Sequence, residues 1–335
     1  MMTKTQSYLV VLTMSIFLLS CEKLDEPGNL VPKTADQDPT IPSIKIADRI
    51  LHAEAFGNPD STIIVCLHGG PGADYKYMYP AKDLVNYGYK VVFYDQVGSG
   101  LSQRFDESYY SNKNLDEIFL NELKGIINYY KTNPNQKVIL FGQSWGAMLA
   151  TAYAGRYPDE IHGLVIIEPG GLKWADVIEY ISKSQAIPIW KEIANDGLYQ
   201  DQFISTKKDN HEILDYKMAM FASHGSPNVE FAPEDGLSND KFWRQGSVIN
   251  LISFKYGQKS KPDLGAGIGT YTKPILFMYG GKGNVYTDEW ATKVSSVYVN
   301  KEIFKIDGVG HSGMFYTSAW TNVTLPKIVN YLNSL

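Results

Sequence analysis

Cysteine is scarce in this sequence of 335 residues: only Cys21 and Cys66 are present. Two cysteines cannot form the disulfide framework on which small secreted folds depend, so the fold must rest on a hydrophobic core. No group of Cys and His residues has the spacing of a metal site, and the dinucleotide fingerprint G-x-G-x-x-G is absent. The sequence therefore implies neither a metal nor a nucleotide cofactor.

Long basic stretches are also missing. The formal net charge is −5, a weak acidic excess that argues against a nucleic-acid partner. With 44% hydrophobic residues, the chain has enough apolar material for one large domain, with or without an insertion.

The N-terminal apolar run, from about Tyr8 to Leu19, is too short to span a bilayer comfortably. It follows Lys4 and fits the apolar region of a secretory signal peptide, which we place over residues 1–20. The run ends in LLSC, which resembles the bacterial lipobox, whose Cys becomes the lipidated first residue of the mature protein. An ordinary signal peptide or a short anchor is the alternative. We therefore expect acyl chains on Cys21 to hold the protein at a membrane surface of the bacterial cell envelope.

A polar, Pro-rich stretch follows, and its composition predicts a flexible tether over residues 21–41. Beyond it, short apolar runs alternate with longer mixed segments, as in folds whose strands are covered on both faces. The expected strands are Ile44–Ala47, Ile63–Leu67, Lys90–Tyr94, Lys137–Phe141, Gly163–Ile167, Pro274–Tyr279 and Glu302–Ile306, and the expected helices include Leu115–Lys131, Gly146–Arg156 and Trp320–Leu332. This alternation predicts an α/β fold with a mostly parallel sheet and helices on both faces.

One segment, residues 171–261, breaks the alternation. It contains helical stretches and no good candidate for a buried strand. We interpret it as a mostly helical cap inserted into a core made of residues 42–170 and 262–335.

The motif Gly142-Gln143-Ser144-Trp145-Gly146 lies between a buried strand and a helix. A G-x-S-x-G motif in this context indicates a nucleophile elbow, in which a strained turn projects the Ser hydroxyl clear of the sheet. The helix that starts there helps to stabilise negative charge. Ser144 is the candidate nucleophile.

The loop His68-Gly69-Gly70-Pro71-Gly72 also follows a strand, at the sheet edge where α/β proteins bind ligands. Such a loop can aim a backbone N–H at a developing oxyanion. We assign this role to the N–H of Gly70, with the N–H of Trp145 as its partner. His68 is expected to orient the loop.

The loop DGVGHSGMF follows the last expected strand and carries His311. A base that comes after the nucleophile in the chain has the order typical of α/β-hydrolases. His311 is the candidate base.

The motifs HGGPG, DQVGSGLS (Asp95–Ser102) and GQSWG, in this order and spacing, resemble the proline iminopeptidase family of α/β-hydrolases. The usual forms in that family are HGGPG, DQRGxGxS and GGSWG. The resemblance spans roughly Ile44 to Leu335, with the cap as its weak part. It implies an eight-stranded core, a helical cap, a cofactor-free serine mechanism and release of N-terminal residues from peptides. Two departures stand against that specificity: Val97 replaces the Arg of DQRG, and the cap lacks the acidic segments that hold a substrate's free amine.

The resemblance also leaves a catalytic acid to be found, because the position of the family's Asp reads Gly283, beside Asn284. Glu168 emerges at the end of the preceding core strand, and neighbouring strands lie about 4.8 Å apart, so its carboxylate could reach the same His. Some haloalkane dehalogenases of this superfamily show that swap. Glu168 is the expected acid, although Asp288 is an alternative and Glu168 could be an ordinary loop carboxylate.

The sequence thus predicts a serine hydrolase acting on a small molecule or short peptide through an acyl-enzyme. Ser144 attacks the carbonyl, His311 transfers protons, Glu168 orients the imidazole, and Gly70 and Trp145 bind the oxyanion. A peptidase and a carboxylesterase both remain open. The alternative from another class is a non-catalytic, ligand-binding lipoprotein on a hydrolase scaffold.

Overall fold

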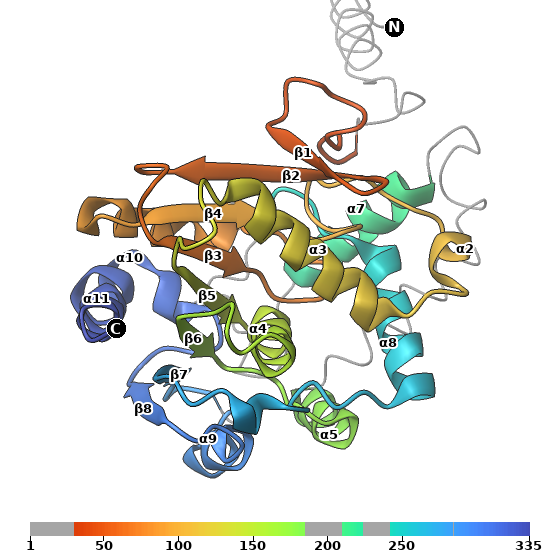
Figure 1. Ribbon diagram of the computed structural model, residues 1–335. Helices are drawn as coiled ribbons and strands as arrows, with labels where there is room; N and C mark the ends of the chain where they lie inside the picture. Colours follow the sequence, from red (N-terminus) through yellow and green to blue (C-terminus); the bar gives the residue numbers. More distant parts are fainter. Residues whose placement is uncertain (1–29, 185–209, 224–241, 284) are drawn as a thin grey trace, which may run out of the picture.

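A computed structural model describes residues 30–184, 210–223, 242–283 and 285–335 of the chain (Figure 1). These residues contain one eight-stranded sheet with the order β1-β2-β4-β3-β5-β6-β7-β8. The strands are β1 (Ser43–Ile46), β2 (Arg49–Phe56), β3 (Ile63–Leu67), β4 (Lys90–Tyr94), β5 (Val138–Gln143), β6 (Gly163–Ile167), β7 (Ile275–Gly280) and β8 (Lys301–Ile306). The first three strands of this order pair antiparallel and the remaining pairs are parallel, which confirms the predicted mostly parallel sheet.

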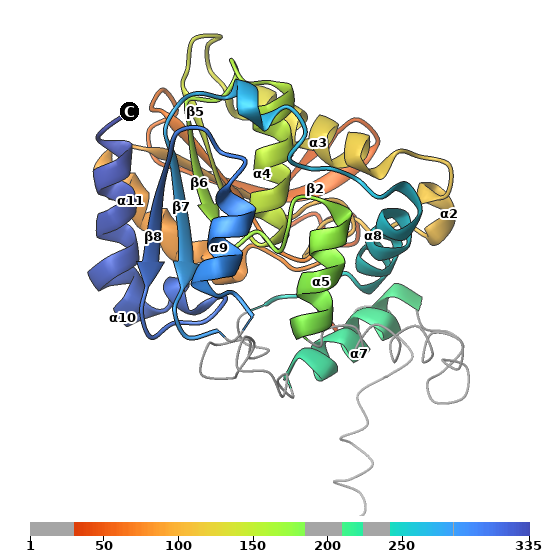
Figure 2. The same cartoon turned by 90° about the horizontal axis from the view of Figure 1, so that it is seen from below.

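Helices cover both faces of the sheet (Figure 2). They are α2 (Glu107–Tyr110), α3 (Leu115–Tyr130), α4 (Trp145–Arg156), α5 (Trp174–Ser184), α7 (Asn210–Ser223), α8 (Ser247–Ser260), α9 (Asp288–Ser295), α10 (Thr317–Ala319) and α11 (Leu325–Leu332). The described residues also form the 3₁₀ helices η1 (Lys76–Tyr87), η6 (Ile268–Thr270) and η7 (Gly313–Phe315), and η8 (Trp320–Thr324) is a π-helical turn. Two apolar cores result, one under α3, α4 and α9 and one under η1 and α11.

The strand residues explain this layering. In β3 through β7 every residue is buried, because each face of these strands packs against helices. The predicted strands agree with the observed ones except for β2, which the sequence analysis missed.

The described residues between β6 and β7 form α5, α7 and α8. Figure 2 shows α5 and α7 beyond the carboxyl ends of the parallel strands, the edge at which the predicted site residues emerge. The carboxyl ends of the strands therefore face these helices.

The predicted flexible tether is wrong for its described part, residues 30–41. Val31 and Ala35 are buried, and the N–H of Ala35 donates to the carbonyl of Leu101 at 2.7 Å. The segment also contacts the cap, because the N–H of Leu30 donates to Glu212 Oε1 at 2.7 Å. The prediction from composition overlooked the apolar side chains of this Pro-rich segment, of which Val31 and Ala35 are buried.

Cys21 and the predicted signal peptide lie outside the described residues. Within the described ranges, no helix is long and apolar enough to cross a bilayer.

Candidate active site

Ser144 stands at the sharp turn between β5 and α4, with φ 56° and ψ −122°. A non-glycine residue with positive φ is strained, and such a conformation persists only where the surrounding structure holds it in place. A Cβ on Gly142 would lie 2.3 Å from the carbonyl oxygen of Gly146, and one on Gly146 would lie 1.9 Å from that of Leu67. Both glycines of the motif are therefore required by close backbone packing around Ser144.

Glu168 and His311 come together. Glu168 Oε2 lies 2.6 Å from Nδ1 of His311, and the two residues are 1% and 5% exposed. The other carboxylate oxygen, Oε1, accepts a hydrogen bond of 2.5 Å from the N–H of Gly280 at the end of β7. Since β6 pairs directly with β7, the acid at the tip of one strand is fixed by the backbone of the next.

Asp288, the alternative acid, lies elsewhere. Its Oδ1 accepts hydrogen bonds from Tyr279 Oη at 3.0 Å and Lys305 Nζ at 2.7 Å, and its side chain is 70% exposed. The structure therefore brings Glu168, and not Asp288, against the imidazole of His311.

The two predicted oxyanion donors, the N–H groups of Gly70 and Trp145, both belong to residues that line the cavity beside Ser144. Among the described groups, neither N–H has an acceptor. Trp145 is the first residue of α4, and the N–H groups in the first turn of a helix have no acceptor within that helix. The N–H of Gly69 is different, because Tyr77 Oη accepts it at 2.8 Å. Of the two adjacent glycines, it is thus Gly70 whose N–H has no acceptor among the described groups.

His68 does not face the reaction. It is fully buried, its Nε2 accepts a hydrogen bond from the N–H of Gln96 at 3.0 Å, and burial lowers its pKa. This neutral ring fixes the loop, in line with the role expected from the sequence.

Sequence reasoning missed two residues that connect these loops, Tyr77 and Gln143. Tyr77 Oη donates to Gln143 Oε1 at 2.6 Å, and Gln143 Nε2 donates to the carbonyl of His311 at 3.0 Å. Together with the bond from Gly69, these contacts form a buried chain from the oxyanion loop to the histidine loop. The one available signal was Gln143 itself, which stands where the resembling family has Gly.

A second amide supports the other side of the elbow. Gln96 Nε2 donates to the carbonyl of His68 at 3.0 Å, and Gln96 Oε1 accepts from Trp145 Nε1 at 2.8 Å. The indole after the nucleophile is thereby tied to the loop that carries Gly70.

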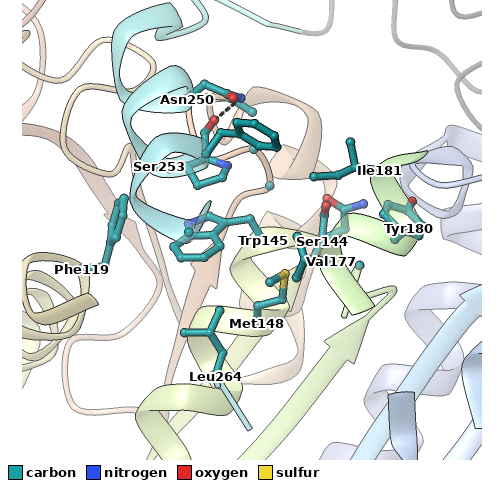
Figure 3. A pocket seen from close by; sticks show the side chains of 18 of the residues that line it. Phe119, Ser144, Trp145, Met148, Val177, Tyr180, Ile181, Asn250, Ser253 and Leu264 are labelled. Carbon is teal, nitrogen blue, oxygen red and sulfur yellow. Dashed lines mark hydrogen bonds between the residues drawn. The ribbon is translucent and has the colours of Figure 1, made fainter. Parts of the chain in front are cut away.

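A cavity of about 330 Å³ lies beside Ser144, and its wall also includes Gly70, Trp145 and His311. Much of the remaining wall is apolar (Figure 3). It includes Phe119 of α3, Met148 of α4, Val177 and Ile181 of α5, Phe254 of α8, and Leu264 in the loop after α8. The candidate nucleophile, base and oxyanion donors thus border one largely apolar space. Such a space excludes water and strengthens polar interactions within it.

Comparison with known proteins supports this fold and identifies a family. The family model described as serine aminopeptidase, S33, matches residues 58–314. A proline iminopeptidase of Saccharolobus solfataricus is 40% identical over 105 residues, which are 31% of this chain and 32% of that protein. The chain thus matches about a third of the length of that relative. An AB hydrolase superfamily protein of Bacillus subtilis, YfhM, is 24% identical over 287 residues, 84% of this chain and 92% of that protein.

Solved structures show the same architecture. The proline iminopeptidase of Mycobacterium smegmatis superposes with a TM-score of 0.56 at 16% identity, covering 86% of this chain and 97% of that one. An esterase of Thermogutta terrifontis gives a TM-score of 0.59 at 15% identity, covering 88% and 97%. At these identities the likeness concerns the fold alone, and it confirms the α/β-hydrolase fold predicted from the sequence.

Proposed function

Because the chain belongs to the serine aminopeptidase S33 family of α/β-hydrolases, we propose that it is a serine hydrolase. It cleaves an amide or ester bond through an acyl-enzyme. The observation that carries this proposal is the position of His311, which pairs with the buried Glu168 and lines the same cavity as Ser144, a serine on a strained turn.

In the first half of the reaction, Ser144 Oγ attacks the substrate carbonyl while His311 Nε2 takes the hydroxyl proton. The carboxylate of Glu168 holds the Nδ1–H tautomer and offsets the positive charge that develops on the ring. The tetrahedral oxyanion accepts hydrogen bonds from the N–H groups of Gly70 and Trp145. Collapse expels the leaving group, which receives the proton from His311.

In the second half, water replaces the leaving group. His311 removes a proton from this water as it attacks the acyl-enzyme, and then returns the proton to Ser144 Oγ when the acid product leaves. The same five groups therefore serve both half-reactions, and no cofactor takes part.

The test is covalent labelling with a fluorophosphonate, which reacts with activated serines. The wild-type protein should be labelled once, and Ser144→Ala should not be labelled. His311→Ala should lose on the order of 10⁴ in rate, as expected when a triad member is removed. An unlabelled wild-type protein would instead favour the non-catalytic binding protein.

Two substrate classes are supported by different observations. The apolar wall around Ser144 favours an ester or amide with an apolar acyl group. The similarity to proteins named proline iminopeptidase favours release of N-terminal residues from peptides. A panel of aminoacyl amides and short-chain esters, compared by kcat/KM, separates them.

We also propose that Cys21 is lipidated and that the protein is anchored to a membrane of the bacterial cell envelope. The support is the N-terminal apolar run that ends in LLSC. Cys21→Ala should block processing or release the protein into the soluble fraction. A variant that is still processed and still fractionates with membranes would contradict the anchor.

A further inference from the structure

The cavity beside Ser144 has an uneven charge. Among the described residues that line it, Asp116 is the sole carboxylate, and no Lys or Arg is present. His311 is already engaged with Glu168. The wall therefore presents one negative group in otherwise apolar and aromatic surroundings.

Asp116 lies away from the nucleophile. It belongs to the first turn of α3, one turn before Phe119, whose ring packs against Trp145 at 5.1 Å between centroids. Figure 3 shows Phe119 on the far side of Trp145 from Ser144. Asp116 therefore lies one helical turn from a ring that is itself on the far side of Trp145 from the reacting serine.

The carboxylate of Asp116 has no cationic partner among the described residues. Its Oδ2 accepts a hydrogen bond of 3.1 Å from Tyr256 Oη, and burial raises its pKa. The adjacent Glu117 differs, because it forms an ion pair with Arg156. Both acids occupy the first turn of α3, where negative charge is favourable. The helix end accounts for the presence of both acids, but it does not account for the position of Asp116 at the cavity wall.

Aromatic rings surround this end of the cavity. Those that line it include Phe119, Trp145, Trp174, Phe254 and Tyr256, and the rings of Trp174 and Phe254 lie 5.7 Å apart. Aromatic faces attract cations, and the attraction grows when the site is shielded from water. A carboxylate among such rings is suited to an organic ammonium group and unsuited to an anion.

We propose that the cavity accepts substrates whose acyl group ends in an organic cation, with the ammonium held by Asp116 among these rings. The cation is remote from the scissile bond, at the end of an apolar spacer. The inference rests on the proposed function, because Ser144 must attack the carbonyl at the near end of the same acyl group.

The experiment compares three p-nitrophenyl esters with spacers of equal length. Their acyl groups end in trimethylammonium, in the uncharged tert-butyl isostere, or in a carboxylate. The wild-type protein should hydrolyse the cationic ester with a kcat/KM roughly tenfold above that of the isostere, and the anionic ester below it.

Asp116→Asn should bring the ratio of cationic to neutral kcat/KM close to one. A ratio is used because any general effect of the substitution on the fold acts on both esters and cancels. Glu117→Gln is the matched control: it removes a charge from the same helical turn outside the cavity, and it should leave the ratio at its wild-type value.

A wild-type ratio near one, or a raised ratio that survives in Asp116→Asn, would overturn this inference while hydrolysis of the neutral ester upholds the serine hydrolase. Failure to hydrolyse any of the three esters, together with failure to react with the fluorophosphonate, would overturn the proposed function and this inference with it.

Discussion

Glu168 has a backbone φ of 42°, a strained value for a residue with a side chain. The strain is offset by what the carboxylate contacts, since its two oxygens face the N–H of Gly280 and the ring of His311. In both contacts Glu168 supplies the hydrogen-bond acceptor. A neutral amide has only one acceptor atom, so it can satisfy only one of them.

Glu168→Gln should therefore lower kcat by on the order of a thousandfold or more, because the imidazole loses both its orientation and its counter-charge. Asp288→Asn is the control, and its exposed site predicts little change. Steady-state kinetics on one activated ester measures both variants. A large loss in Asp288→Asn with near-normal activity in Glu168→Gln would place the acid at Asp288.

Tyr77→Phe tests the connection between the two catalytic loops. The change removes one hydroxyl and leaves the N–H of Gly69 and Gln143 Oε1 buried without their partner. An unsatisfied buried group of this kind lowers the free energy of unfolding by about 1–3 kcal/mol. We expect kcat to fall roughly tenfold with a smaller change in KM. Tyr79→Phe, on the same segment but bonded to Lys82, is the control. Equal kinetics in both variants would show that the connection is only structural.

Prediction from sequence placed several of these residues where the structure has them, and their catalytic roles stay predictions. Glycines at strand ends mark turns with few alternatives, and the loops of Ser144, His311 and Gly70 meet at one cavity. Parallel strands share one edge, and Glu168 lies against His311. Tyr77 and Gln143 were missed, because they are 66 positions apart and no periodicity links a tyrosine to a distant amide. Such contacts depend on tertiary packing, which local patterns do not encode.

Among the elements, β2 was missed for a related reason. Its sequence RILHAEAF places His52 and Glu54 within a strand, which removes the continuous apolar run used to find the others. The fold accepts both residues because His52 Nδ1 lies 2.7 Å from Asp95 Oδ2, and Glu54 Oε2 accepts from Tyr75 Oη at 2.7 Å. The side chains of His52 and Glu54 are thus satisfied by partners distant in the sequence.

The cap helix α7 is joined to the core by a buried ionic cluster. Asp215 Oδ2 accepts from Arg104 Nε at 2.9 Å and from Arg244 Nε at 2.7 Å, and Asp215 Oδ1 accepts from the N–H of Ser247. Arg104 follows β4 and Arg244 precedes α8. One carboxylate thus connects three separate parts of the chain.

Asp215→Asn should lower the free energy of unfolding by about 3–5 kcal/mol, because two buried guanidinium groups lose their counter-charge. Asp106→Asn, at a side chain that is 85% exposed, should change it little. Urea unfolding measures both variants. If Asp215→Asn unfolds at the wild-type midpoint, the cluster does not hold the cap to the core.

The stability of the whole molecule should depend on the protonation of His52. Burial alone would lower the pKa of His52, but Asp95 and then Glu54 outweigh it and raise that pKa above its ordinary value of 6.5. The folded protein therefore binds this proton more tightly than the unfolded chain does. The contribution is complete below that ordinary value and disappears as the pH rises through the higher folded pKa.

We expect the free energy of unfolding to decline with pH above about 6.5, and His52→Gln to decline less steeply. Glu122, whose pKa burial raises to about 7, and Asp74, whose pKa burial also raises, act with the same sign and are present in both proteins. The difference between the two profiles therefore reports on His52 and on its interaction with Asp74. His162→Gln is the control, because burial lowers the pKa of His162 and moves its titration below this range. Parallel pH profiles for the wild-type protein and His52→Gln would contradict the expectation.

The packing of residues 30–35 against core and cap limits how far a lipid-anchored protein could move from the membrane surface. Even fully extended, the stretch from Cys21 to Leu30 measures at most about 30 Å. Leu30 is bonded to Glu212 on α7, so a lipid on Cys21 would keep that helix within this distance of the bilayer. The rate of hydrolysis would then depend mainly on the concentration of substrate at the membrane surface and far less on its concentration in the bulk solution.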